Sequence, residues 1–228
     1  SLSGTINVTG SGDAIVLGSG ARFLNPDAHS LSPGTGRWLV WSSDPRDDNL
    51  GGLVFDFRQY NATFGTTAVA DSRNGFLYSL APVATPSLTG SVIKAYDGDA
   101  IATLAGSNYA VAVTVGGLPA ALAGDAITFN NPATGSYDSR NAGTGKNVTV
   151  TGIAIDSQSN GGATVYGYQL GSTAASATIG AITARAITLA ALAGQGKVYG
   201  DDDPLSAKAA YAVVAGSLAS GDAVIGEM

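Results

Sequence analysis

The chain contains no cysteine, which excludes disulfide bonds and thiolate metal sites. Methionine, histidine (His29) and glutamate (Glu227) each occur once, whereas there are sixteen aspartates. Charged residues make up only 12% of the 228 residues, and the 11 lysines and arginines are scattered without a run. The formal net charge is −6. Because binding to phosphates requires clustered basic side chains, we expect no nucleic-acid partner.

Long apolar runs are also missing. No stretch approaches the ~20 apolar residues that a membrane helix requires, so we expect no membrane insertion by this segment. No sustained heptad pattern is present, which excludes a coiled coil. The start has no charged region followed by an apolar core, so no signal peptide is visible. Because Ser1 and Met228 both fall within a running pattern, we expect the chain to be a segment of a longer protein.

Glycine, threonine, serine and asparagine dominate between short apolar runs, and 32 residues are glycine. Hydrophobic residues reach 45% by count, but much of this share is alanine and valine, and aromatic residues contribute 7%. Such a composition is typical of a β-rich protein with many turns and thin cores. We therefore predict an all-β fold.

Residues 1–86 are predicted to form one part of the chain. In residues 1–28, short strand-like pieces alternate with Gly-Ser turns, which suits the C-terminal end of a right-handed parallel β-helix; an ordinary meander of short strands is the alternative. Apolar runs at 38–41, 53–57 and 76–80 follow, and we interpret them as an aromatic-rich cap on the open core. Pro82 and Pro86 then predict a short, stiff linker.

Residues 87–191 are predicted to form an Ig-like antiparallel β-sandwich. From Tyr109 to Val115 apolar side chains alternate strictly, which predicts a strand with one buried face. Further strands are expected at 91–96, 126–129, 148–155, 165–170 and 184–189, separated by turn-forming clusters. The alanine-rich runs at 119–123 and 174–177 could each form a helical turn.

Two short motifs are repeated along the chain. The motif at 94–98, KAYDG, has an echo at 197–201, KVYGD, and LAGDA at 122–126 has an echo in LASGDA at 218–223. The first offset, 103 residues, is about the size of one small sandwich domain. We interpret residues 192–228 as the incomplete start of a second module.

The motif KAYDGDAIATL resembles the opening of the YDG repeat, and GKVYGDDDP resembles that of the MBG repeat. Both repeats occur in two-partner-secretion adhesins of the filamentous haemagglutinin class. The segments RWLVWSSDP and FDFRQYNATFG look like the part that joins the β-helix shaft to those repeats. The resemblance covers nearly the whole chain and implies a biofilm-matrix adhesin. It implies secretion through an outer-membrane partner, a location at the bacterial cell surface, and binding to exopolysaccharide, other cells or a host.

Sequence signatures of an enzyme are absent, and we expect no catalytic activity and no cofactor. His29 lies in a turn rich in proline and serine, without ligand-like neighbours, so a solvated or structural role is expected. The aspartates stand beside glycine and proline, which favours turn capping over paired glycosidase carboxylates. A surface glycan hydrolase is the weaker alternative.

Several polar sites could support other chemistry. The aspartates Asp201–Asp203 could hold calcium, as could Asp97 and Asp99, but the spacing of a calcium loop is absent and solvated turns are the expected state. Glycosylation sequons begin at Asn7, Asn61 and Asn147. An isopeptide bond is conceivable at Lys94 or Lys146, although no carboxylate partner is evident.

The tyrosines are the best candidates for ligand contact. Tyr166 and Tyr168 are predicted to bind a sugar, because aromatic faces pack on pyranose rings. Tyr60 and Tyr137 could do the same if exposed. Tyr96 and Tyr199 occupy equivalent repeat positions and are expected to be core or corner tyrosines with the hydroxyl bonded to backbone. The functional expectation is an adhesin segment that makes weak, multivalent contacts; a passive spacer, with binding elsewhere in the parent protein, is the alternative.

Overall fold

The computed structural model describes residues 1–120, 122, 124–191, 198–200 and 211–224. These residues form strands joined by turns, together with one short 3₁₀ segment, Gly106–Asn108, and no α-helix occurs among them. The predicted all-β class is therefore confirmed. Within the same residues, no helical segment has the length and hydropathy needed to cross a membrane.

The strands are short, and most have six residues or fewer. Their bounds, in chain order, are β1 (Ile6–Asn7), β2 (Asp13–Gly18), β3 (Leu31–Ser32), β4 (Arg37–Ser42), β5 (Phe57–Gln59), β6 (Gly75–Tyr78), β7 (Val83–Leu88), β8 (Val92–Ala95), β9 (Ile101–Thr103), β10 (Tyr109–Val115), β11 (Leu118–Pro119), β12 (Asp125–Phe129), β13 (Thr134–Tyr137), β14 (Gly143–Thr151), β15 (Ile155–Asn160), β16 (Ala163–Tyr166), β17 (Gln169–Leu170), β18 (Ala174–Thr183), β19 (Thr188–Ala191) and β20 (Tyr211–Ala215).

The chain divides into two compact units built from interleaved segments. Unit 1 comprises residues 1–87, 109–132 and 151–175, and unit 2 comprises residues 88–108, 133–150 and 176–228. The expected linker at Pro82–Pro86 is wrong, because β7 runs through this stretch as a strand. The boundaries predicted at residues 86/87 and 191/192 stay predictions.

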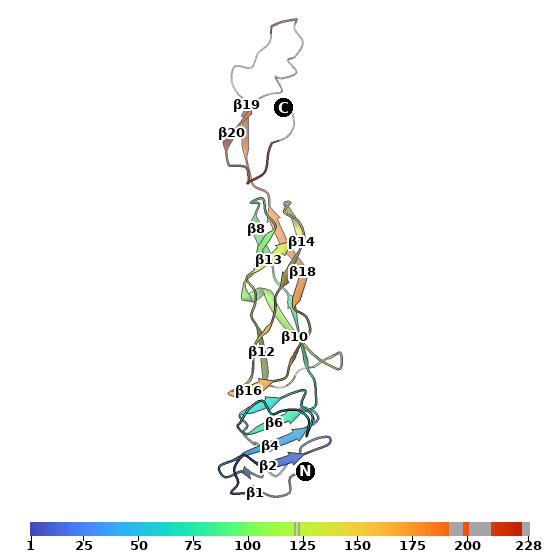
Figure 1. Ribbon diagram of the computed structural model, residues 1–228. Coiled ribbons are helices and arrows are strands. Elements are labelled where there is room, and N and C mark those ends of the chain that lie inside the picture. The colour runs from blue at the N-terminus through green and yellow to red at the C-terminus, as the bar shows by residue number, and fades with distance from the viewer. Residues whose placement is uncertain (121, 123, 192–197, 201–210, 225–228) are drawn as a thin grey trace. The chain divides into compact units, whose positions relative to one another are not determined.

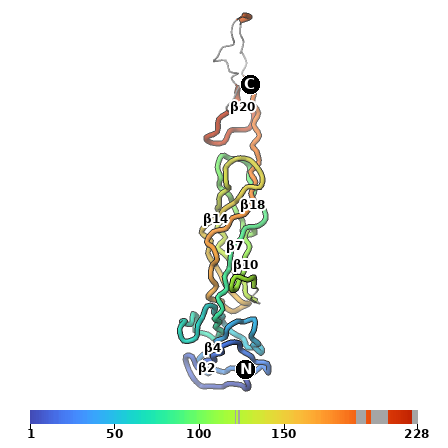
Figure 2. Tube along the Cα trace, turned by 90° about the vertical axis from the view of Figure 1, so that its right-hand side faces the viewer, coloured from blue at the N-terminus to red at the C-terminus, as the bar shows by residue number. Residues whose placement is uncertain are grey.

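Unit 1 contains a seven-stranded sheet in the order β12-β15-β16-β5-β6-β4-β2. The five strands from β16 to β2 pair in parallel, and β15 and β12 continue antiparallel. Strands β2, β4 and β6 lie side by side (Figure 1), and β2 and β4 are also neighbours when the molecule is turned by 90° (Figure 2). One row across the sheet holds Trp41, Leu77, Gln59 and Tyr166 in register.

The aromatic segment predicted as a cap supplies the core of unit 1. Strand β4 is buried on both faces, as its sequence predicts, and all four residues of β6 are buried. On one face lies an apolar cluster, and the ring of Phe76 lies 5.2 to 5.8 Å from three other aromatic rings. The members of the cluster are Leu39, Trp41, Phe57, Ala62 and Leu77, with Val69 and Tyr166 packed against them. Each such ring pair is worth about 1 kcal/mol beyond its buried area.

Strand β10 lies in the second sheet of unit 1, in the order β11-β10-β7-β17. The predicted strand from Tyr109 to Val115 is confirmed, but the predicted buried face is wrong: none of its residues is buried, and Val111 is 39% exposed. The alternation of apolar side chains indicates a strand. Burial of one face of that strand requires a second layer of structure packed against it, which the local sequence does not specify.

Unit 2 contains a five-stranded sheet in the order β8-β18-β14-β13-β9. The two end strands, β8 and β9, follow one another in sequence and contact each other, so the sheet is nearly closed and barrel-like. Its interior holds buried side chains, including Val92, Tyr137 and Val148. An Ig-like sandwich stays a prediction. The helical turn expected at 174–177 is wrong, because these residues begin β18.

A candidate binding site around Asp71 and Asp125

A hollow of about 530 Å³ lies on unit 1 beside the loop that precedes β6. Its wall combines a charged pair with small and hydroxylated residues. The lining residues are Gly12, Asp13, Thr35, Gly36, Arg37 and residues 69–72. The buried Gln59 fixes the loop, because its amide group donates to the carbonyl of Ala68 at 2.9 Å and accepts from the amide of Ala70 at 2.8 Å.

The charged pair of the hollow is Arg37 with Asp13. The Nε of Arg37 donates to Oδ1 of Asp13 at 2.5 Å, and its Nη1 donates to the carbonyl oxygen of Asp71. The Arg37 side chain is 17% exposed, whereas Asp13 is 49% exposed. Arg37 is therefore held by the protein, and the half-exposed Asp13 carboxylate is the charged group that faces solvent.

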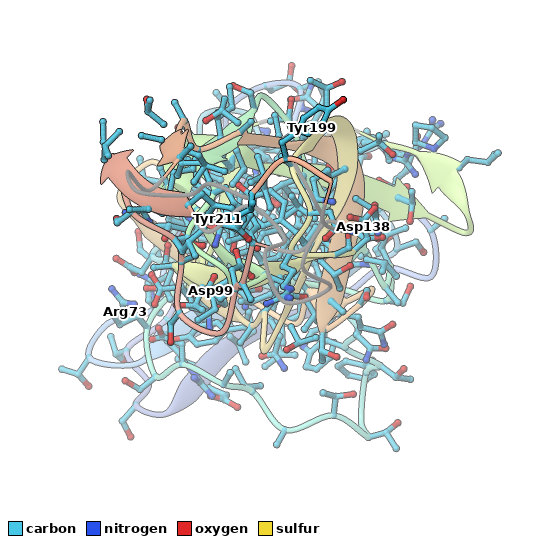
Figure 3. All side chains as sticks on the ribbon, turned by 90° about the horizontal axis from the view of Figure 1, so that it is seen from above. Arg73, Asp99, Asp138, Tyr199 and Tyr211 are labelled. Carbon is cyan, nitrogen blue, oxygen red and sulfur yellow. The ribbon has the colours of Figure 1, made fainter. Side chains whose placement is uncertain are left out.

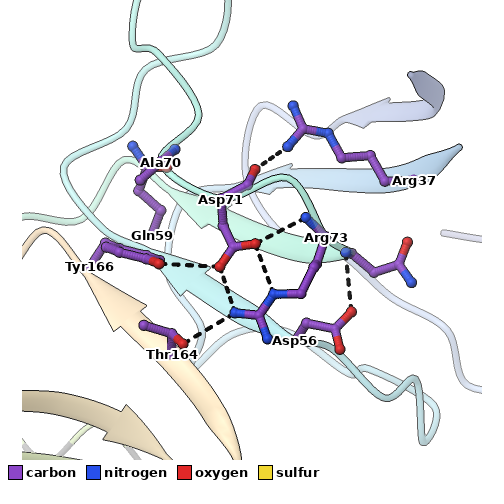
Figure 4. A network of polar contacts seen from close by, with 9 residues as sticks. Arg37, Asp56, Gln59, Ala70, Asp71, Arg73, Thr164 and Tyr166 are labelled. Atoms are coloured by element: carbon purple, nitrogen blue, oxygen red, sulfur yellow. Dashed lines mark hydrogen bonds and ion pairs between the residues drawn. The ribbon is translucent and has the colours of Figure 1, made fainter.

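In the wall of the hollow, Asp71 organises a polar cluster (Figure 4). Its Oδ1 accepts from the amide and the Nε of Arg73, and its Oδ2 accepts from Arg73 Nη2 at 2.6 Å and from the hydroxyl of Tyr166 at 3.1 Å. These bonds, chiefly those from the Arg73 side chain, hold the pKa of Asp71 well below its usual range. Asp71 is therefore a charged acceptor near neutral pH.

Tyr166, one of the two tyrosines predicted to bind sugar, connects this cluster to the core. Its ring packs on the apolar cluster, 6.3 Å from the ring of Phe57, and the residue is half-buried. Burial, followed by the bond to Asp71, raises the pKa of its hydroxyl. Tyr166 is connected to Arg37 through Asp71, because its hydroxyl donates to the Asp71 carboxylate and Arg37 donates to the Asp71 carbonyl oxygen.

Asp125, at the start of β12, organises a second, deeper cluster. Its side chain is 1% exposed and accepts four hydrogen bonds. Tyr60 and Tyr168 donate to Oδ2 at 2.6 and 2.9 Å. The Nη1 of Arg58 and the Nδ2 of Asn160 donate to Oδ1 at 3.2 and 2.7 Å. A buried carboxylate needs such charge-assisted bonds to offset its desolvation.

Tyr168, the other predicted sugar ligand, belongs to this buried cluster. It is 7% exposed, and its ring lies 5.2 Å from that of Tyr60. Burial first, then the nearby Asp125, raises the pKa of its hydroxyl. Tyr60 and Tyr137 are buried as well. Ligand binding by Tyr166 and Tyr168 stays a prediction, and Tyr166 is the one residue of these four that is only half-buried.

The other polar candidates have local partners or lie outside the described residues. Asp97 bonds to Lys94 at 2.7 Å, and Asp99 pairs with the same lysine. Lys146 bonds to Asp138 at 3.0 Å. The calcium candidates Asp201–Asp203 lie outside the described residues. Within the described part of the chain, no group of three or more histidine, aspartate or glutamate side chains is placed to hold a metal ion.

Three further expectations concern residues of other regions. The backbone of His29 exchanges two hydrogen bonds with the Asn25 amide group, which gives this segment a structural role. Asn7 and Asn61 are exposed and Asn147 is half-buried, and glycosylation at these sequons stays a prediction. Tyr199, expected in the core, is fully exposed instead, and Tyr96 is half-buried.

Sequence reasoning did not single out Arg37, Asp71 or Asp125 as site residues. Asp125 carried one usable signal, since it lies in the repeated LAGDA motif. Arg37 and Asp71 carried none, because their contacts join residues 34 positions apart. Such pairs become visible only when the parallel strands are placed in register.

Comparison with known families gave one match in the region that follows the aromatic segment. Neither the comparison with curated proteins nor the comparison with solved structures found a match. Residues 81–177 match the family model described as YDG domain. This segment holds KAYDGDAIATL, the motif that carries the YDG resemblance, and it includes Asp125, Tyr166 and Tyr168. The match supports a protein that carries a YDG repeat.

Proposed function

We propose that this chain is a segment of a large secreted bacterial surface adhesin, and that the hollow of unit 1 contacts a sugar of an exopolysaccharide or another surface glycan. In this proposal the parallel sheet is the end of a right-handed β-helix shaft. Residues 87–191 form a YDG-like repeat of sandwich type, and residues 192–228 begin an MBG-like repeat. An outer-membrane partner secretes the full-length protein, which acts at the cell surface in cell, matrix or host attachment.

The observation that carries the proposal is the composition of the hollow beside a segment that matches the YDG domain. Sugars are recognised by carboxylates and hydroxyl groups that exchange hydrogen bonds with their hydroxyls, and by partly exposed aromatic rings. The hollow offers the half-exposed Asp13 and the exposed residues Thr35 and Ser72. Tyr166 lies behind the same loop, bonded to Asp71. Asp13 is held by Arg37 and the hydroxyl of Thr35 by the carbonyl of Gly10, so binding by these two groups loses little side-chain entropy.

The same geometry favours binding over hydrolysis. A glycosidase acid must keep its proton near neutral pH, which requires a raised pKa. Arg73 lowers the pKa of Asp71 instead, and Asp13 is paired with Arg37. We therefore propose a segment without catalytic activity. Product release from an exopolysaccharide by the purified chain would contradict this.

A passive spacer is the remaining alternative. It predicts no binding of the purified chain to a glycan array or to the producing organism's matrix polysaccharide at high micromolar concentration. It also predicts intact adhesion when residues 87–191 of the parent protein are replaced by an unrelated sandwich. The proposal predicts binding that Tyr166→Ala and the double variant Asp13→Asn/Ser72→Ala weaken about tenfold or more. Thr103→Ala, at an exposed threonine of β9 in unit 2, is the matched control and should bind as the original chain does.

A further inference from the structure

Two Gly-Asp turns of this chain have the same geometry. In the first, the amide of Asp125 donates to the carbonyl of Leu122 at 3.0 Å. In the second, the amide of Asp222 donates to the carbonyl of Ala219 at 3.1 Å. The glycine before each aspartate has a positive φ, 83° and 82°, a conformation that favours glycine. The first residue of each turn is buried.

The two turns also occupy equivalent places in the sequence, because they are the repeated motifs LAGDA and LASGDA. The first belongs to the predicted module 87–191 and the second to the segment 192–228. The segment that precedes the first aspartate's module is residues 1–86, and the one that precedes the second aspartate's segment is residues 87–191. The partners of each aspartate show whether it contacts the segment before its own.

The first aspartate, Asp125, contacts the segment before its own module as well as Asn160 and Tyr168 of that module. Tyr60 donates to its Oδ2, and the Nη1 of Arg58 donates to its Oδ1. Both partners belong to the aromatic segment that ends at residue 86. Within unit 1, the Gly-Asp turn of one module is thus held by a tyrosine and an arginine of the preceding segment.

The second aspartate, Asp222, repeats this arrangement within unit 2. Its carboxylate faces the hydroxyl of Tyr96 and raises the pKa of that group, and Nη1 of Arg140 lies 3.6 Å from its Oδ1. Arg140 also donates to the carbonyl of Gly98 at 3.3 Å. A Cβ at Gly98 would lie 3.1 Å from the Cβ of Ala219, so the turn packs directly against the Tyr-Asp-Gly motif.

We propose that these two sites are copies of one joint, in which the Gly-Asp turn of a module is received by a tyrosine–arginine pair of the segment before it. The buried first turn residue supplies apolar contact, and the carboxylate faces a hydroxyl and a guanidinium, both of which stabilise its negative charge. In this assignment the tyrosine of the Tyr-Asp-Gly motif, Tyr96, is a docking residue for the segment that follows. The joint fixes residues 211–224 to the sheet of unit 2.

The chain offers matched controls for this proposal. Tyr199 occupies the repeat position equivalent to Tyr96, and its side chain is fully exposed (Figure 3). Asp156 is an exposed aspartate of β15. Tyr199→Phe and Asp156→Asn therefore make the same chemical changes as Tyr96→Phe and Asp222→Asn, at positions outside either joint.

The test is hydrogen exchange of the whole chain, read at the backbone amides of β20, Asp222 and β14. We expect Asp222→Asn and Tyr96→Phe each to speed exchange in β20 and at Asp222 about tenfold or more, because the segment opens locally, and to leave β14 unchanged. Because both variants break one joint, the double variant should exchange no faster than the more affected single variant. The two control variants should exchange as the original chain does.

The recurrence of the joint is tested in the same experiment at the first site. Tyr60→Phe keeps the ring of a buried residue and is expected to speed exchange in β12. Unchanged exchange in β20 in both Asp222→Asn and Tyr96→Phe would overturn the joint. Additive effects in the double variant would overturn it as well, because the two side chains would then act separately. If Asp222→Asn and Tyr96→Phe speed exchange at Asp222 but Tyr60→Phe leaves exchange in β12 unchanged, the claim that the joint recurs is overturned.

Discussion

Tyr60, which follows β5, and Tyr168, which precedes β17, donate hydrogen bonds from their hydroxyls to the same oxygen of Asp125, at 2.6 and 2.9 Å. The two rings also contact each other, with centroids 5.2 Å apart. One buried carboxylate therefore ties together the chain at residues 60, 125 and 168. The stability of unit 1 should depend on that charge.

Asp125→Asn should lower the free energy of unfolding by about 3 kcal/mol, because it removes the negative charge opposite the buried guanidinium of Arg58. The substitution keeps the shape of the side chain, so the loss reports the charge. Urea unfolding at pH 7, followed by tyrosine and tryptophan fluorescence, measures it. Asp156→Asn should change stability by less than about 0.5 kcal/mol. Equal effects of the two substitutions would contradict the assigned role of Asp125.

The buried tyrosines predict a loss of stability at alkaline pH. Burial raises the pKa of Tyr60 and Tyr168 above the value of about 10 that tyrosine has in an unfolded chain. Above pH 10 the unfolded chain therefore releases protons that the folded chain retains, and the free energy of unfolding falls as pH rises. Below pH 10 this contribution is complete. Urea midpoints at pH 9, 10 and 11 should fall less steeply for Tyr60→Phe/Tyr168→Phe; an unchanged slope would contradict the prediction.

Asp71 predicts the opposite dependence at acid pH. Its pKa is lowered chiefly by Arg73, whereas an unfolded aspartate titrates near 3.9. Its contribution to stability is present above about pH 4 and is lost as pH falls further, because the unfolded chain then binds protons first. Asp71→Asn should flatten the fall in thermal midpoint between pH 4 and pH 2. A fall as steep as that of the original chain would show that Asp71 does not contribute.

The parallel strands β5 and β6 pack so closely at Gly75 that a side chain there would meet Phe57. A Cβ at this position would lie 2.1 Å from a ring carbon of Phe57, and both residues are fully enclosed in the core. Gly75→Ala should therefore destabilise the chain by about 2–3 kcal/mol through overpacking. Gly162→Ala is the control, since no heavy atom lies within 4 Å of its Cβ position. Thermal unfolding of the two variants side by side makes the comparison; a Gly75 variant as stable as the Gly162 variant would contradict the packing.

Much of the fold was predictable where local sequence determines structure. The apolar runs around Trp38 and Phe76 are strands covered on both faces, as their composition predicts. The strand from Tyr109 to Val115 is present, but its burial was not predictable, since burial depends on a second layer. The run at 174–177 is a strand because it pairs within the barrel-like sheet, which overrides the helical preference of alanine.

The candidate site was predictable only in part. Tyr166 and Tyr168 look alike in sequence, yet they bond to different carboxylates, Asp71 and Asp125. Gly167 separates them, with a φ of 89° that ends the extended chain between the two rings. Their partners lie 95 and 43 residues away along the chain. Such contacts follow from the register of the sheet and have no local signal.

The central claim is that the hollow beside Asp71 binds a sugar. The most direct test is to titrate the isotope-labelled chain with an oligosaccharide of the producing organism's exopolysaccharide and to follow the amide resonances by NMR. We expect the largest shift changes at Gly12, Gly36 and residues 70–72, and we expect Asp13→Asn/Ser72→Ala to abolish them. Shift changes confined to unit 2, or no change at millimolar oligosaccharide, would contradict it.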